Sequence, residues 1–169
     1  WEATDMERLT NEQYVWVAAR LALGWTFLWA FLDKAFGLGY ATQTEDAWVN
    51  GGSPTTGFLT YATNGPLSGL YEGLAGNAAV DAVFMAALLL LGAALILGVA
   101  NRVAGYGGAL LMLLMWTSRL PPENNPVIDD HIVYLIVLLG ISVVLPGRWL
   151  GLGKWWSEQP LVKRFPILQ

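Results

Sequence analysis

The residues best suited to chemistry lie in two short stretches of the chain. Asp33 and Lys34 end one long apolar run, and Asp129, Asp130 and His131 begin another. His131 is the only histidine, and an imidazole can carry a proton at neutral pH. A carboxylate beside it can orient the ring or relay its proton. The pattern therefore predicts His131 and Asp129 as catalytic residues.

Basic side chains at the ends of the apolar runs can bind an anion or the carbonyl oxygen of a quinone. Lys34 and Arg119 hold such positions, and with Asp33 and Asp130 they form the predicted substrate- or quinone-binding set. Structural pairing is the alternative, because helix N-termini favour acids and C-termini favour bases. Asp33 does not fit that rule. It therefore needs a partner, which we expect to be Lys34 or Arg119.

Composition excludes several kinds of chemistry. The chain has no cysteine, which excludes thiolate nucleophiles, iron–sulfur clusters and cysteine-ligated zinc from its own side chains. A metal site at Asp129, Asp130 and His131 is disfavoured, because successive helical residues point in different directions. We therefore predict neither a metal nor a covalent cofactor, and a membrane quinone as the one cofactor. Net charge is −4 with no basic block, so nucleic acid is not an expected partner.

Long apolar segments must position these residues. Hydrophobic residues make up 55% of the chain and charged residues 13%, whereas soluble domains carry about 25% charged residues. A membrane-spanning helix needs about 20 mostly apolar residues. The sequence therefore predicts one all-α membrane domain, residues 1–169, built as an antiparallel bundle of four transmembrane helices. The expected spans are about 14–36, 79–100, 103–120 and 130–145.

Basic residues predict how the bundle is oriented, because they concentrate on the cytoplasmic side. With four spans, both termini and the second connection share one side of the membrane. Seven of the nine Lys and Arg residues fall there, namely Arg8, Arg20, Arg102, Arg148, Lys154, Lys163 and Arg164. Both termini are therefore expected in the cytoplasm. Residues 1–13 are too polar for a signal peptide.

The connections also carry predictions. The outer loop, residues 37–78, should hold two short interfacial helices, about 55–63 and 66–74, with Ser53 and Pro54 starting the first. These helices either contact a ligand or only shield the bundle. The tail, residues 147–169, should lie along the inner surface, against anionic headgroups or a cytoplasmic partner.

The second and third spans are separated by little more than Asn101 and Arg102, which predicts a tight antiparallel hairpin. Gly105, Gly107 and Gly108 open the third span, and small residues allow helices to approach closely.

Two stretches together resemble a known family. The first span reads RLALGWTFLWAFLDKAFG from Arg20 to Gly37, and the fourth opens NPVIDDHIVY from Asn125 to Tyr134. With four spans and a long first outer loop, this resembles the DoxX/DoxD family. The resemblance implies a four-helix protein of the prokaryotic cytoplasmic (plasma) membrane. The family member DoxD is the membrane subunit of a thiosulfate:quinone oxidoreductase, which oxidises thiosulfate to tetrathionate and passes electrons to a quinone with a second subunit, DoxA.

Two functions follow as hypotheses. The first is a subunit of a quinone-linked redox system resembling that oxidoreductase, with the bilayer and a protein subunit as partners. No segment resembles DoxA, so an activity that requires it would be absent from this chain alone. The alternative is a non-catalytic scaffold or accessory subunit of a larger membrane complex. A lipid or small-molecule carrier ranks last, because the inverted repeat of many transporters is missing.

Overall fold

The fold is all-α, with no strand among residues 8–169, the part that the computed structural model describes. Residues 1–7, with the N-terminus expected in the cytoplasm, lie outside that part. Four long helices dominate the fold: α1 (Asn11–Phe36), α4 (Ala78–Leu97), α5 (Asn101–Thr117) and α6 (Asp130–Val144). Their bounds agree with the four predicted segments to within three residues.

Two of these helices, α1 and α4, are long and apolar enough to cross a membrane. They have 26 and 20 residues, whereas α5 and α6 have 17 and 15. The helix ends follow local rules. Thr10 and Gln13 form a reciprocal capping box before α1, and Gly37 ends that helix in the left-handed conformation.

The long helices pack most closely in two pairs, α1 with α4 and α5 with α6. A Cβ added at Gly92 of α4 would lie 2.7 Å from the backbone nitrogen of Leu28 in α1. A Cβ at Gly105 of α5 would lie 2.6 Å from the carbonyl oxygen of Leu138 in α6. Glycine is therefore required at both contacts. A Cβ added at Gly107, by contrast, would make only an ordinary contact with the Leu91 side chain. Only part of the predicted glycine interface is therefore present.

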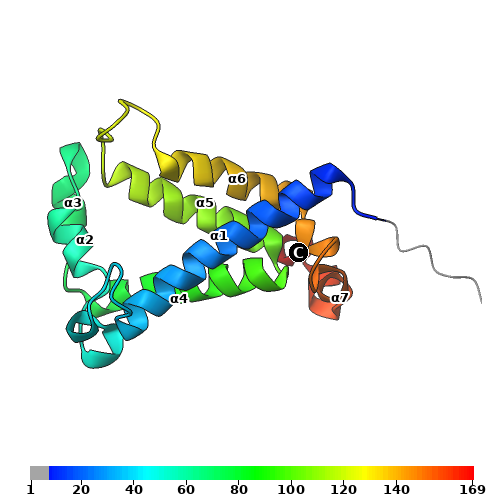
Figure 1. Ribbon diagram of the computed structural model, residues 1–169, viewed down its shortest axis with the longest axis horizontal. Helices are drawn as coiled ribbons and strands as arrows, with labels where there is room; N and C mark the ends of the chain where they lie inside the picture. Colours follow the sequence, from blue (N-terminus) through cyan, green and yellow to red (C-terminus); the bar gives the residue numbers. More distant parts are fainter. Residues whose placement is uncertain (1–7) are drawn as a thin grey trace, which may run out of the picture.

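The two helix pairs diverge from one end of the molecule to the other (Figure 1). α4 and α5 are joined by a short turn at Gly98–Ala100, yet they contact each other far less than either contacts its own partner. The predicted tight hairpin is therefore wrong: the turn is tight but the helices splay. The physical reason is that α4 meets α1 through Gly92, and α5 meets α6 through Gly105, so the closest approaches lie elsewhere.

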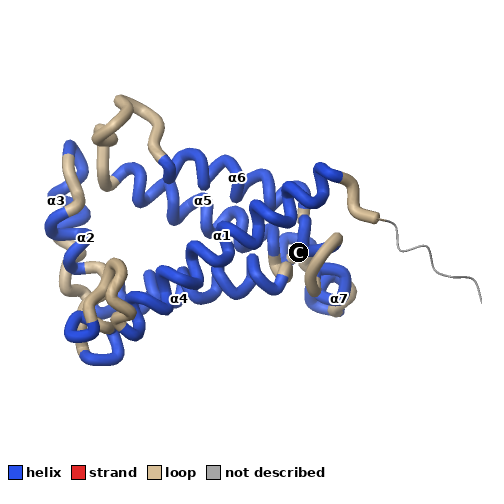
Figure 2. Tube along the Cα trace, in the orientation of Figure 1, coloured by secondary structure: helices blue, strands red, loops and turns tan. Residues whose placement is uncertain are grey.

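The outer loop folds into short helices that lie across the open end of the bundle (Figure 2). They are η1 (Thr44–Asp46), η2 (Trp48–Asn50), α2 (Thr56–Tyr61), η3 (Gly65–Leu67) and α3 (Ser68–Glu72). The two predicted short helices are therefore present. The first begins at Thr56, whose backbone N–H donates to Ser53 Oγ at 3.2 Å, and the buried Asp81 of α4 accepts hydrogen bonds from the Thr55 N–H and hydroxyl groups and from Ser53 Oγ.

The start of α1 and the C-terminal tail lie together at the opposite end (Figure 1). The tail forms η4 (Pro146–Arg148), α7 (Gly153–Ser157), α8 (Pro160–Arg164) and η5 (Pro166–Leu168). Arg20 fixes this end: the residue is 1% exposed, and its guanidinium donates to the carbonyl oxygens of Leu95, of Ile96 at 3.1 Å and of Leu150 at 2.7 Å. Arg20 therefore caps the end of α4 and ties the tail to it.

Candidate functional site

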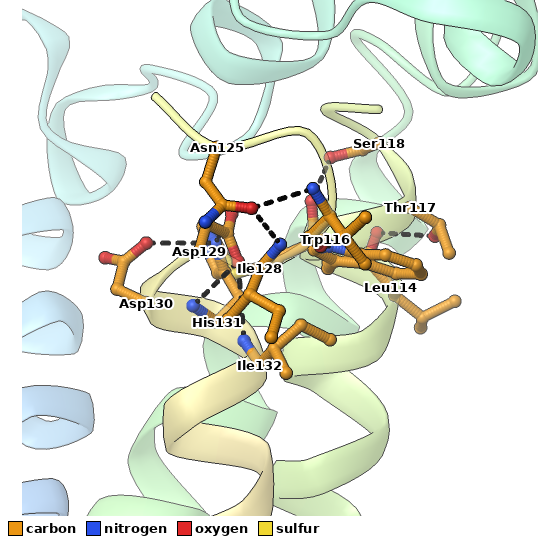
Figure 3. Close-up of polar contacts among 12 residues, drawn as sticks. Leu114, Trp116, Thr117, Ser118, Asn125, Ile128, Asp129, Asp130, His131 and Ile132 are labelled. Atoms are coloured by element: carbon orange, nitrogen blue, oxygen red, sulfur yellow. Dashed lines mark hydrogen bonds and ion pairs between the residues drawn. The ribbon is translucent and has the colours of Figure 1, made fainter. Parts of the chain in front are cut away.

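The start of α6 is held in place by the loop before it (Figure 3). The Asn125 side-chain oxygen accepts from the backbone N–H groups of Val127 at 2.9 Å and Ile128 at 3.0 Å. Trp116 at the end of α5 donates its indole N–H to the Val127 carbonyl at 2.9 Å. These bonds turn the chain so that Asp129 arrives as the N-cap of α6.

Asp129 both caps α6 and orients His131. One carboxylate oxygen accepts from the backbone N–H groups of His131 at 3.1 Å and Ile132 at 3.4 Å. The other lies 2.8 Å from Nδ1 of the His131 ring. Burial alone would raise the pKa of the Asp129 carboxyl. The hydrogen bond and charge of His131, together with the backbone N–H groups of His131 and Ile132, have the larger effect and lower that pKa. The carboxylate is thus ionised and accepts only, so Nδ1 carries the proton.

The opposite nitrogen of the ring is free. His131 is 9% exposed, and its Nε2 has no hydrogen-bond partner among residues 8–169. Nε2 also remains accessible to a ligand. Among residues 8–169, the one fully buried side-chain nitrogen or oxygen without a partner is Nε of Arg20. With the proton fixed on Nδ1, a neutral ring presents Nε2 as an acceptor and a charged ring presents it as a donor.

Asp130 completes the polar cluster from its exposed edge. Its carboxylate lies 3.4 Å from His131 Nδ1, and possible ligand atoms of Asp129, Asp130 and His131 all lie within 4.8 Å of one another. The expectation that these side chains point apart is therefore wrong. Asp129 precedes the helix in an extended conformation, with φ −125° and ψ −172°, so its side chain turns back over the first helical turn. Helix capping and the imidazole bond already account for this convergence.

His131 faces a cavity of about 200 Å³ between the two helix pairs, which we call the histidine cavity. Its polar side chains are His131, Lys34, Thr26 and Tyr134. Every other lining residue is apolar, and all four long helices contribute: Leu23, Phe27, Ala30, Phe84, Leu88, Met112 and Met115. The site is therefore an apolar chamber at the open end of the bundle with a histidine and a lysine on its wall.

Lys34 lies where three hollows meet. It lines the histidine cavity, a cavity of about 270 Å³ under α2 and α3 that we call the cap cavity, and a polar vestibule of about 590 Å³ in the outer loop. The Lys34 ammonium makes no ion pair and no side-chain hydrogen bond within residues 8–169. It is thus an available cation beside an apolar chamber.

Two predicted binding residues lie elsewhere. Asp33 is 2% exposed, and its carboxylate accepts from the backbone N–H groups of Tyr40 at 3.2 Å and Ala41 at 2.9 Å. The expected ion pair with Lys34 or Arg119 is therefore wrong, because the loop after α1 folds back and supplies backbone donors. Arg119 is half-buried, lines none of these three hollows and pairs with Asn64 through its backbone.

Sequence reasoning missed the cavity wall. Thr26, Phe27, Ala30 and Lys34 follow helical spacing on one face of α1, and Tyr134 lies three residues after His131. That periodicity was a usable signal. The contributions of α4 and α5 depend on how far the helix pairs splay, which no local pattern encodes.

Comparisons with protein-family models, with curated proteins and with solved structures find no significant match to this chain. The function is therefore argued from the site itself.

Proposed function

We propose that this chain is a four-span protein of the prokaryotic cytoplasmic membrane that binds a membrane quinone in the histidine cavity. It would serve as a subunit of a quinone-linked redox system resembling thiosulfate:quinone oxidoreductase. The observation that carries the proposal is the pair of available nitrogen groups, His131 and Lys34, on the wall of one apolar cavity. The resemblance of α1 and the start of α6 to the DoxX/DoxD family points the same way.

The outward faces of the long helices support membrane insertion. Large apolar side chains that face away from the core are widely exposed: Val83 by 70%, Leu90 by 67%, Ile136 by 62% and Val143 by 72%. Such surface is unfavourable in water and favourable in hydrocarbon. The shorter α5 and α6 would cross with the help of flanking loop residues or local thinning of the bilayer. The end that carries the tail would face the cytoplasm.

The donor set of the cavity fits a quinone. A quinone ring is flat and apolar, with carbonyl oxygens that accept hydrogen bonds. Among residues 8–169, the Lys34 ammonium has no side-chain partner and His131 Nε2 has no hydrogen-bond partner, so both can serve a ligand. Ligand sites generally combine an apolar lining with a few placed polar groups, which describes this cavity.

The side chains would divide the work. A bound quinone supplies redox chemistry by taking up electrons and protons. His131 holds a proton at Nδ1 against Asp129 and can take up or release one at Nε2. Lys34 would hold a positive charge beside a quinone oxygen, where it would favour negative charge on that oxygen.

Electrons must come from outside this chain's own side chains. With no cysteine and one histidine, residues 1–169 supply no ligand set for an iron–sulfur cluster or a bis-histidine haem. The donor would be a soluble reductant such as thiosulfate or a partner subunit.

Binding tests the proposal before turnover does. Purified protein in lipid nanodiscs should bind a decyl benzoquinone saturably, and both His131→Ala and Lys34→Met should weaken binding. Lys154→Met, in the exposed tail, is the matched control and should leave it unchanged. If both cavity variants still bind the quinone as the wild type does, the proposed quinone site is wrong. Reduction of the bound quinone by thiosulfate, with and without a co-purified subunit, then tests the reaction.

A scaffold role is the second candidate, and the tail favours it. Trp155, Leu161 and Phe165 are 56%, 60% and 47% exposed, beside the exposed Lys163 and Arg164. This surface suits headgroups or a cytoplasmic protein. Purification in mild detergent decides between them: a stable partner without quinone binding supports the scaffold, and a partner-free protein counts against it.

A further inference from the structure

The cap cavity continues the histidine cavity. Lys34, Phe84 and Met115 line both. Beyond them the wall of the cap cavity is mostly apolar and comes from three elements: Phe58 and Leu59 of α2, Val80 of α4 and Leu111 of α5. With a volume of about 270 Å³, it extends the site away from His131 as an apolar arm.

This arm adjoins the polar vestibule of the outer loop through Lys34, Pro54 and Phe58, and it also opens sideways. Leu74 and Leu114 line the cap cavity, yet they are 37% and 47% exposed, so they border its mouth. Both α4, through Val80 and Phe84, and α5, through Leu111 and Leu114, line this cavity. Tyr71 spans the mouth, because its hydroxyl donates to the Leu114 carbonyl at 3.0 Å or bonds Thr117 Oγ1 at 2.6 Å. In a membrane this mouth would face the lipid chains.

We propose that the occupant is a lipid with one ring and one long apolar tail. The ring would lie in the histidine cavity, and the tail would run through the cap cavity and leave past the exposed side chains of Leu74 and Leu114, beside the Tyr71 bridge. This inference rests on the proposed function and adds the route of the quinone's tail and its exit. A free polar or ionic ligand fits this arm poorly, because its lining surface is mostly apolar despite Lys34, Thr55, Tyr71 and Ser118, and burying polar groups without partners is costly.

The tail route makes a specific steric prediction. Val80 lines only the arm, whereas Val83, one turn along the same helix, is 70% exposed and lines neither cavity. Val80→Phe should fill the arm, and Val83→Phe is the matched control. Forcing a chain into a filled site costs enough to weaken binding about tenfold or more. An apolar tail is about as favourable in the bilayer as in the cavity, so the substitution acts only through steric exclusion. The partitioning of the probe into the bilayer is the same for every variant and cancels in the comparison.

The experiment compares two probes in nanodiscs: decyl benzoquinone and the same ring with no tail. Val80→Phe should weaken binding of the decyl probe about tenfold and leave the short probe unchanged. Val83→Phe should change neither. Leu114→Trp at the mouth, with the exposed Leu110→Trp as control, repeats the test if Val80→Phe does not fold.

The outcomes separate the two proposals. If both arm variants bind the decyl probe as the wild type does, the tail route is wrong and the quinone site stands. If both probes weaken equally, the arm is not specific for a tail and the inference is again overturned. If the wild type binds neither probe, the proposed function fails and the tail route fails with it.

Discussion

Replacing Asp129 with asparagine should reverse the tautomer of His131 without releasing the start of α6. One carboxylate oxygen caps the helix and the other accepts from Nδ1. Asparagine caps about as well as aspartate, so its single oxygen keeps the first role. Its amino group then faces Nδ1 as a donor. The ring must accept there, and its proton moves to Nε2.

The expected energies follow from these contacts. A charge-assisted hydrogen bond contributes about 2 kcal/mol and a neutral one about 1 kcal/mol. Asp129→Asn exchanges the first for the second and should cost about 1 kcal/mol of stability. Asp129→Ala loses the cap, worth about 1 kcal/mol, as well as the imidazole bond, and should cost about 3 kcal/mol in total.

The assay uses the fact that the chain has a single histidine. Nitrogen NMR of protein labelled only at histidine, recorded at alkaline pH, reports this one ring. The wild type should show the proton on Nδ1, and Asp129→Asn should show it on Nε2. The assigned geometry would be refuted if the wild type carried its ring proton on Nε2, or if the wild type and Asp129→Asn gave the same spectrum.

The pH dependence of stability checks the same contact. The pKa of Asp129 is lowered in the folded protein from its ordinary value of about 3.9. Its stabilisation is therefore complete above that value and is lost as the pH falls through the lower folded-state pKa. The difference in unfolding free energy between wild type and Asp129→Asn should shrink over this acidic range. A difference that stays constant there would contradict the assignment.

Three further substitutions test other parts of the structure. Lys34→Met should reduce the thermal stabilisation given by a bound quinone, with Lys154→Met as the unaffected control; equal melting shifts would count against a cavity role for Lys34. Arg20→Met leaves the carbonyls at the end of α4 unpaired, so denaturant unfolding should show a loss of about 3 kcal/mol, and a loss near zero would mean that the cap is dispensable. Gly92→Ala should cost about 1–3 kcal/mol by forcing α1 from α4, while Gly107→Ala should cost little.

The helix framework could be predicted from the sequence because its causes are local. Apolar runs of the right length, Thr10 before α1 and Gly37 after it fix the helix ends through hydrogen bonds between near neighbours. The two short helices of the outer loop were predicted for the same reason. The splay of α4 from α5 was not, because it depends on which glycines find a partner helix. Gly92 and Gly107 look alike in sequence, but only Gly92 lies against a backbone.

The site was predictable in part. The link between Asp129 and His131 followed from their proximity in the chain. Lys34 was named as a binding residue, and its place in the same cavity as His131 emerges only from the packing of the helix pairs. For Asp33 the sequence predicted an ion pair. The structure instead supplies backbone donors from a loop that folds back, and no residue pattern predicts that fold.

Photolabelling tests the central claim, that a quinone occupies the cavity between the helix pairs, most directly. An azido-substituted quinone with a decyl tail, activated by light in nanodiscs, should label Phe84 and Met115, which line both cavities. Excess unlabelled decyl benzoquinone should abolish that labelling. Labels confined to outward-facing residues such as Ile136 and Val143, and insensitive to competition, would contradict the account.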